Sequence, residues 1–490
     1  MCDKKSLYCS LSSLICAFFF CFAAIFALMH CLMGSLLFSL FGVAIGAYSM
    51  IKNQGQFFSL QLVFWLFSAL YALSTPLNLC FGGKVDSTFA AGNMEENVFP
   101  FLVAYALSSL GFFAGCSWVY RFRVQSPLDT SKQTRKKLDL SIIQRGLFFT
   151  AILTSFFELV NLIRVGGVNM LFVGKGVYQS AVGDLSLTLP SETIYGICGI
   201  FIGLYLSYIK VNNVSNKKIK LFFAFLLLFP FLFCKTLLGQ RGALVSALLS
   251  GIASYSIYTP IKRIRIKTLV GLLLVYVFLM ALYTNRGIVS LLLTNPNEFV
   301  SRALDFQRLK ENLNPSNSEF GAAFGNFCMF YEKYGTRFDK QYGLTYVKGL
   351  LVMIPSFLFP GEKPLAITYV FRDEFFPSWA SRSRIASTGF SSILEAYMNG
   401  GFLGVFLIYS LIGFLVKKLD MLRNRQGQLL SIMISSILIG TCMDFSRSEF
   451  GGLLSTVFWD IVYCIIIYCF ITCFGYNNDP YNIKDHELLD

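Results

Sequence analysis

The chain has 490 residues, of which 55% are hydrophobic and only 14% are charged. A soluble globular domain carries about 25% charged residues, and the apolar residues occur in long blocks without the alternation of a membrane β-barrel, so both classes are excluded. The net charge of +14 would favour nucleic-acid binding in a soluble protein. Here much of that charge lies in short loops, and we expect no nucleic-acid partner.

Apolar blocks long enough to cross a hydrocarbon core of about 30 Å recur along the chain. The first block, after Lys4 and Lys5, is too long for the core of a signal peptide and is predicted to be a retained helix. The sequence therefore predicts an all-α polytopic membrane protein of about twelve transmembrane helices. Their expected ranges are 7–29, 32–51, 57–79, 98–119, 142–164, 192–209, 221–238, 242–259, 268–284, 402–416, 429–444 and 452–474.

Basic residues concentrate in every second connection between these predicted spans. The connections around residues 52, 121–137, 210–220, 262–267 and 417–425 hold most of them, whereas the short turns near residues 30, 84, 240 and 447 hold at most one or two each. Cytoplasmic loops of membrane proteins carry the excess of Lys and Arg. We therefore predict a bacterial inner-membrane protein with both termini in the cytoplasm.

Two segments do not belong to predicted spans. One is the polar, Gly-rich segment 165–191, and the other is 285–388, whose stretch LLVMIPSFLFPGEKP is apolar but interrupted by prolines and is expected to dip into the membrane interface. The predicted organisation is an N-terminal transmembrane bundle of about nine spans over 1–284, a periplasmic loop region over 285–388, a C-terminal transmembrane bundle of about three spans over 389–475 and a cytoplasmic tail over 476–490.

The residue types present narrow the chemistry. The only histidines, His30 and His486, lie outside the long loop region, so neither a His-ligated metal site nor a His-based catalytic triad is expected. The sequence has no nucleotide-binding motif. We therefore predict a function that needs neither a metal nor a nucleotide cofactor.

Arginines recur at the predicted outer ends of helices and in the long loop. A charge near the membrane is costly, with about 2.5–3.5 kcal/mol on insertion scales, so it tends to be functional or paired. A guanidinium group can bind two phosphate oxygens at once and stays charged. A cluster of arginines would therefore suit the binding of a lipid-linked pyrophosphate. The alternative is that each arginine reaches headgroups or pairs with a local acid, as Arg447 could with Glu449. The candidates are Arg241, Arg286, Arg372, Arg382, Arg384 and Arg447.

Several carboxylates are candidates for proton transfer or for pairing. Ser392 and Glu395 have the spacing of a capping box, which predicts a helix start. Glu395 is also a candidate general base, with Asn399 one helical turn away on the same side. Asp373 is the second candidate base, and Asp444 is a further candidate. Glu158 lies within a predicted span, where it should pair with Arg164 or with another helix.

The run YGLTYVKGLLVMIPSFLFPGEKP, followed by TGFSSILEAYMNGGFLGVFL, resembles the O-antigen polysaccharide polymerase (Wzy) family. The segments GQRGA after the seventh predicted span and SRSEF after the eleventh fit the same pattern. The resemblance extends from about residue 140 to about residue 460, and the first four spans are generic. The related O-antigen ligases use a loop histidine, which this loop lacks.

The resemblance implies a GT-C-like membrane glycosyltransferase of lipopolysaccharide biosynthesis. It would transfer a growing glycan from undecaprenyl pyrophosphate to an incoming lipid-linked repeat unit, at a periplasmic cavity built by residues 165–191 and 285–388. Neither a nucleotide sugar nor a metal would be required. In this reading Glu395, or Asp373 as second choice, is the catalytic base, and the six arginines with Asn399 bind the pyrophosphate or the glycan.

The expected partners are undecaprenyl-pyrophosphate-linked oligosaccharides, membrane lipids, a polysaccharide chain-length regulator and a flippase. Two other functions remain open. The first is an O-antigen ligase or another lipid-linked glycosyltransferase, which differs in its acceptor. The second is a flippase or other transporter of lipid-linked oligosaccharides, which should have short loops and matched halves related by a repeat. The long segment 285–388 and the lack of a repeat favour the polymerase.

Overall fold

The structure is a computed structural model of the chain. It describes residues 4–54, 58–83, 93–121, 139–173, 177–178, 181–182, 188–212, 218–261, 266–285, 288, 291–303, 305–317, 319–334, 336, 339–354, 359, 363–377, 389–425 and 429–473.

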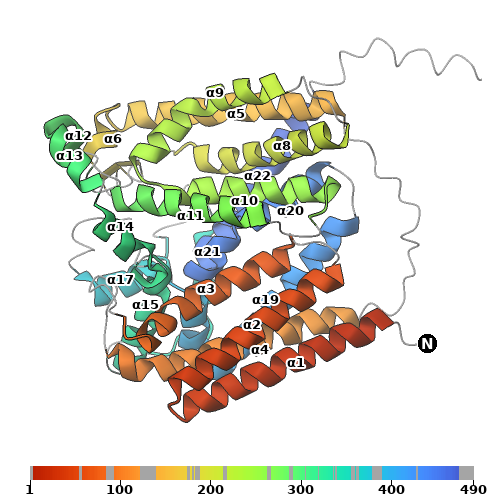
Figure 1. Ribbon diagram of the computed structural model, residues 1–490, viewed down its shortest axis with the longest axis vertical. Helices are drawn as coiled ribbons and strands as arrows, with labels where there is room; N and C mark the ends of the chain where they lie inside the picture. The colour runs from red at the N-terminus through yellow and green to blue at the C-terminus, as the bar shows by residue number, and fades with distance from the viewer. Residues whose placement is uncertain are drawn as a thin grey trace, which may run out of the picture.

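Long apolar helices dominate the described residues and lie nearly parallel to one another (Figure 1). Each predicted span coincides with a helix, or with the helix pair α20 and α21. Within the described residues, nine helical segments are long and apolar enough to cross a membrane, and the predicted all-α polytopic fold is confirmed. The long helices are α1 (Lys4–Leu28), α2 (Leu32–Gln54), α3 (Leu60–Cys80), α4 (Met94–Arg121), α5 (Leu140–Arg164), α8 (Ser191–Val211), α9 (Lys218–Leu237), α10 (Arg241–Tyr258), α11 (Ile266–Asn285), α19 (Ser392–Arg425), α20 (Leu429–Gly440), α21 (Cys442–Arg447) and α22 (Phe450–Cys473).

The long helices form two groups, one above the other in Figure 1. Helices α1 to α4 share one hydrophobic core with α19, whereas α5, α8 and α9 share a second core with α20 and α22. Helices from the predicted C-terminal bundle therefore pack into both groups. The domain boundaries given above stay a prediction.

The contact between α4 and α19 depends on glycine. A Cβ atom on Gly115 would lie 1.8 Å from the carbonyl oxygen of Ser410, and one on Gly413 would lie 2.2 Å from that of Phe112. Small residues allow helix backbones to approach closely inside a membrane, where packing drives association. This crossing joins the N-terminal spans to the helix that carries Glu395.

The two ends of the bundle differ in what they carry. At one end the last turn of α22 meets the start of α5, where the rings of Phe149 and Phe470 stack with centroids 4.3 Å apart. Lys220 at the start of α9 donates to Gln144 there, at 2.7 Å. The short helices lie at the opposite end, away from the N-terminus (Figure 1). We call this second end the outer end, in keeping with the predicted orientation.

The segment predicted as a periplasmic loop is largely helical where it is described. It contains α12 (Leu291–Thr294), α13 (Pro296–Ala303), α14 (Phe306–Leu313), the 3₁₀ helix η2 (Pro315–Asn317), α15 (Glu319–Lys333), α16 (Leu344–Val352) and α17 (Ile367–Phe375), while α6 (Met170–Val173) precedes α8. Phe324, Phe327 and Phe330 of α15 are fully buried against the first core. Part of this segment is therefore an integral layer of the bundle, because its aromatic residues bury apolar surface there.

Candidate functional site

A short helical piece carries Glu395 at the outer end of α19. The helix is interrupted at Gly400 and Gly401, and Gly401 has φ +60°, which glycine adopts without strain. The Ser391 side chain accepts from the Leu394 amide at 3.1 Å, whereas Ser392 bonds to the Tyr409 hydroxyl at 2.7 Å. The predicted helix start is confirmed, but the predicted capping box is wrong, because Ser391 caps the helix and the Glu395 carboxylate binds other elements.

The Glu395 carboxylate joins three elements that are distant in the sequence. One oxygen accepts from the Thr345 hydroxyl of α16 at 2.7 Å, and the other accepts from the Phe450 amide at the start of α22 at 2.6 Å. Glu395 is only 1% exposed, and within the described residues no cation pairs with it. Such a carboxylate is stabilised by hydrogen bonds and by the amino end of a helix.

Asn399 lies beside Glu395, as the helical spacing predicted. Its side-chain amide donates to the Thr345 hydroxyl oxygen at 2.7 Å and to the Glu395 carbonyl at 2.8 Å. Its side-chain oxygen accepts from the Gly343 amide at 2.8 Å. Asn399 therefore fixes the start of α16 against α19 and holds Thr345 in place.

Helix α16 reaches α22 because both have glycine at the crossing. A Cβ atom on Gly349 would lie 3.0 Å from the Gly451 Cα atom. Beside this crossing is a cavity of about 230 Å³, which we call the Glu449 pocket. It is lined by Gln341, Thr345, Lys348, Gly349, Val352, Leu365, Ala366, Ile367, Val370, Glu449 and Gly451. Thr345 thus forms part of the wall that separates Glu395 from this pocket.

Glu449 is the carboxylate that lines the pocket directly. It is 7% exposed, and burial raises its pKa, although hydrogen bonds from the backbone oppose that shift. A raised pKa makes a carboxylate a stronger proton acceptor once it is ionised. Sequence analysis considered Glu449 only as a partner of Arg447. Its position directly before α22, two residues ahead of Gly451, is a signal that could have drawn attention to it.

Arg372 and Asp373 form an ion pair on α17. Arg372 is 5% exposed and lies over the Tyr369 ring, with its guanidinium carbon 5.1 Å from the ring centroid. The Asp373 side chain is about half exposed. Burial raises the pKa of Tyr369. The negative charge of nearby Glu449 raises this pKa further, and the positive charge of nearby Arg372 lowers it. Helix α17 also lines the Glu449 pocket through Ile367 and Val370.

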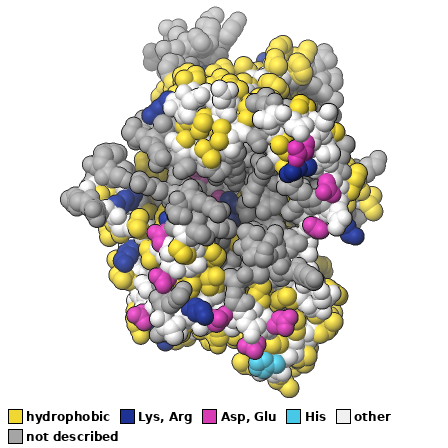
Figure 2. Space-filling view, turned by 90° about the vertical axis from the view of Figure 1, so that its left-hand side faces the viewer, with side chains coloured by type: hydrophobic (Ala, Val, Ile, Leu, Met, Phe, Trp, Pro, Cys, Tyr) yellow, Lys and Arg dark blue, Asp and Glu magenta, His cyan; other side chains and the backbone are white. Residues whose placement is uncertain are grey.

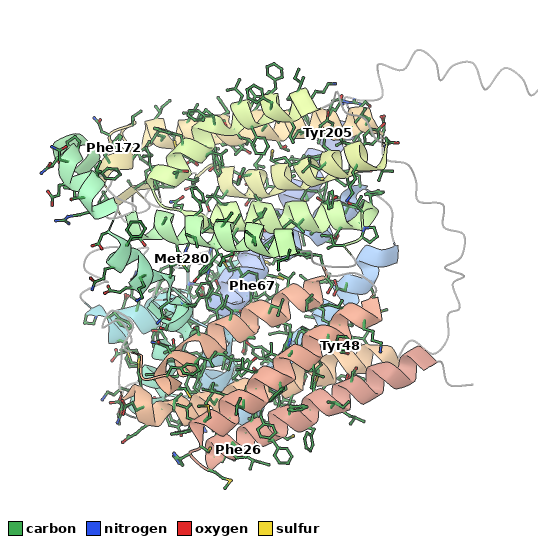
Figure 3. All side chains as sticks on the ribbon, in the orientation of Figure 1. Phe26, Tyr48, Phe67, Phe172, Tyr205 and Met280 are labelled. Carbon is green, nitrogen blue, oxygen red and sulfur yellow. The ribbon has the colours of Figure 1, made fainter. Side chains whose placement is uncertain are left out.

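Arg241 and Arg447, predicted at separate outer turns, lie on the same side of the bundle. A Cβ atom on Gly242 would lie 3.6 Å from a terminal nitrogen of Arg447. Two nitrogens of Arg447, Nε and one terminal nitrogen, each lie 2.8 Å from an oxygen of Asp444. A terminal nitrogen of Arg241 lies 3.0 Å from the sulfur of Met280. Met280 belongs to α11 and is labelled in Figure 3. The acid that pairs with Arg447 is thus Asp444 of its own helix.

A second cavity lies at the outer ends of α5, α8 and α9, and we call it the Gln240 pocket. Its volume is about 390 Å³, and it is lined by Glu158, Asn161, Tyr178, Val182, Thr188, Leu189, Pro190, Ser191, Glu192, Thr193, Lys235 and Gln240. Lys235 lies 3.2 Å from Glu158 and 2.8 Å from Glu192. The expectation that Glu158 pairs with another helix is confirmed, with Lys235 of α9 as its partner.

The remaining candidates, Arg286, Arg382 and Arg384, lie outside the described residues. Figure 2 views the outer end of the molecule and shows acidic and basic side chains interspersed with hydrophobic ones on that face. The structure thus brings together Glu395, Asn399 and Thr345, with Glu449 beside them. It places a terminal nitrogen of Arg447 beside Gly242, the residue that follows Arg241, and it pairs Asp373 with Arg372.

Comparison with known proteins bears on the segment that contains Glu395, Asn399, Arg447 and Glu449. Residues 385–477 match the family model of O-antigen polysaccharide polymerase Wzy. The predicted resemblance to the Wzy family is confirmed by this match, which supports a role as an O-antigen polymerase, a glycosyltransferase. No curated protein and no solved structure matches the chain.

Proposed function

We propose that this chain joins undecaprenyl-pyrophosphate-linked oligosaccharide repeat units into O-antigen or a similar surface polysaccharide, at the periplasmic face of the inner membrane. A hydroxyl of the incoming unit would attack the anomeric carbon of the growing chain. The bond from that carbon to the pyrophosphate oxygen would break, and undecaprenyl pyrophosphate would leave. The energy of this bond suffices without a nucleotide sugar, and the reaction as written uses no metal.

The proposed base is Glu395, acting through the hydroxyl of Thr345. Thr345 lines the Glu449 pocket and donates to Glu395. It could take the proton of a sugar hydroxyl while passing its own proton to the carboxylate. Glu449 is a second candidate, because it lines the pocket without an intervening residue. Asp373 is the third, although its pairing with Arg372 makes it a weaker proton acceptor.

The leaving pyrophosphate is already anionic, so it needs cations rather than a proton donor. Arg241, Arg372 and Arg447 are proposed to supply them, together with Arg286, Arg382 and Arg384. Arg447 lies beside Gly242, the residue that follows Arg241, and this supports a shared anion site. Asn399 would act by holding Thr345, since its amide and its oxygen already bond to Thr345, Glu395 and Gly343.

The observation that carries the proposal is the family match over residues 385–477, which contain Glu395 and Glu449. The test is the glycolipid profile of cells from which this chain has been deleted. Lipid A core capped by a single repeat unit is the result expected for a lost polymerase. Unmodified core with retained long chains would indicate a ligase, and absence of both would indicate a flippase.

The proposed orientation has its own test. An alkaline phosphatase fused at Asn317 should be active, because that residue would be periplasmic, whereas a fusion at Gly427 should be inactive. The opposite pattern would overturn both the orientation and the periplasmic site. A chain-length regulator and a flippase remain proposed partners.

A further inference from the structure

The Gln240 pocket contains a buried acceptor without a hydrogen-bond donor. The side chain of Gln240 is part of its wall and is 6% exposed, and its oxygen has no partner among the described residues. Buried polar groups in folded proteins are nearly always hydrogen-bonded, and each exception calls for an explanation. A ligand hydroxyl would satisfy this oxygen once a rotation of the Gln240 side chain turned it toward the pocket.

The charges around the pocket argue against an anionic ligand. Lys235 is buried and lies between the carboxylates of Glu158 and Glu192, so the three side chains together carry an excess negative charge. The Glu192 side chain is 54% exposed. A pyrophosphate would be repelled here, whereas a carboxylate and an amide oxygen are both good acceptors for the hydroxyls of a neutral sugar.

The wall of the pocket is held in place by its own hydrogen bonds. The amide of Asn161 donates to the Leu189 carbonyl at 2.9 Å and its oxygen accepts from the Leu189 amide at 3.1 Å. Ser191 and Tyr178 both donate to Glu158, at 2.6 and 3.2 Å. Burial, and then the nearby Glu158, raise the pKa of Tyr178, which keeps its hydroxyl protonated as a donor. This part of the wall is therefore preorganised for binding a ligand.

We propose that the Gln240 pocket binds an uncharged sugar residue of a lipid-linked substrate, with its hydroxyls donating to Gln240 and Glu192. This proposal rests on the proposed function, from which the lipid-linked substrate is taken. The pocket volume of about 390 Å³ is in the range of small-ligand sites, about 300–1,000 Å³. Arg241 follows Gln240 directly in the chain, so a sugar held here would lie next to the proposed pyrophosphate contacts.

The test measures binding of a glycan that lacks both lipid and pyrophosphate. The probe is the reducing oligosaccharide released by mild acid from the lipid-linked units of cells without this chain. Binding to the purified full-length protein in nanodiscs would be followed by saturation-transfer NMR. Gln240→Leu should weaken binding about tenfold, because a hydroxyl loses its acceptor. Gln144→Leu is the matched control, since Gln144 is a half-buried glutamine at the opposite end of the bundle.

A second variant guards against misfolding of the first. Glu192→Gln changes a half-exposed side chain, leaves the Lys235–Glu158 pair in place, and should also weaken binding. Equal binding by wild type, Gln240→Leu and Glu192→Gln would overturn the proposal, as would absence of binding by the wild type. Neither result would affect the deletion profile, so failure here is distinguishable from failure of the proposed function.

Discussion

The buried carboxylates at the two outer pockets are stabilised by different groups. In the Gln240 pocket, Glu158 is compensated by Lys235 at 3.2 Å. Beside the Glu449 pocket, Glu395 is held by a hydroxyl and a backbone amide, and within the described residues no cation pairs with it. A carboxylate paired with a cation would have to give up that ion pair to take a proton, whereas one held by a hydroxyl and an amide would not.

The difference suggests a division of labour. We propose that Glu395 of α19 and Glu449, directly before α22, take part in proton transfer, whereas the ion pair of Glu158 and Lys235 stabilises the fold. The pockets also differ in construction. The Glu449 pocket joins segments more than a hundred residues apart, from α16 to α22, whereas the Gln240 pocket is built from residues 158–240.

The largest effect should come from Glu395→Gln. The variant side chain can accept from the Phe450 amide and donate to Thr345, so the network survives while the base is lost. General-base catalysis contributes about 10² to 10⁴-fold, and we expect a loss of that size in polymer formed, measured as the repeat-unit ladder on a gel of cell glycolipids at matched expression.

Glu449→Gln and Asp373→Asn are the comparison variants for Glu395. If Glu395→Gln polymerises normally and Glu449→Gln does not, the pocket-lining carboxylate is the base and the relay through Thr345 is wrong. If only Asp373→Asn loses polymer formation, the catalytic base is Asp373 on α17.

Arg447 should matter next. Losing one preorganised group that stabilises a developing negative charge costs about 10² to 10³-fold, so Arg447→Ala should lower polymer formation by that factor. Arg447→Lys should restore little of it, since lysine cannot bind two phosphate oxygens in the same planar arrangement. The readout is the same ladder, with membrane abundance of each variant as control. Full activity of both Arg447→Ala and Arg241→Ala would reduce these arginines to interface anchors.

The ion pair of the Gln240 pocket should affect stability rather than chemistry. Lys235→Met leaves Glu158 buried without its cation and should lower the free energy of unfolding by about 3–5 kcal/mol. The double variant Lys235→Met/Glu158→Leu should recover most of this loss. Thermal unfolding in detergent measures both. Arg302→Ala, which breaks an exposed ion pair with Glu298, should cost less than about 1 kcal/mol, and an equal cost for Lys235→Met would contradict the buried-pair account.

The sequence predicted the long helices well because hydropathy is a local property. Runs of apolar residues determine a span wherever it packs, and each predicted span coincides with a helix or with the α20–α21 pair. The neighbouring position of Glu395 and Asn399 was predictable for the same reason, since one helical turn separates them. Their partners were not, because Thr345 and Phe450 reach Glu395 only through the crossing of α16 and α22.

Two further features needed the tertiary structure. Burial of Phe324, Phe327 and Phe330 depends on α15 packing against α3 and α4, and polar neighbours in the sequence concealed it. The capping-box reading of Ser392 and Glu395 failed because competing donors from other elements bind the carboxylate. Sequence spacing alone does not show whether a carboxylate binds the amide of its own helix cap or an amide from a distant segment.

The central claim is that this chain forms glycosidic bonds between lipid-linked repeat units. The most direct measurement uses the purified protein in proteoliposomes with purified undecaprenyl-pyrophosphate-linked repeat units, in the presence of a metal chelator and without nucleotide sugars. We expect a ladder of products, with one undecaprenyl pyrophosphate released for each bond formed and no ladder with Glu395→Gln. Absence of a ladder with the wild type, or a ladder that appears only when a nucleotide sugar is added, would contradict it.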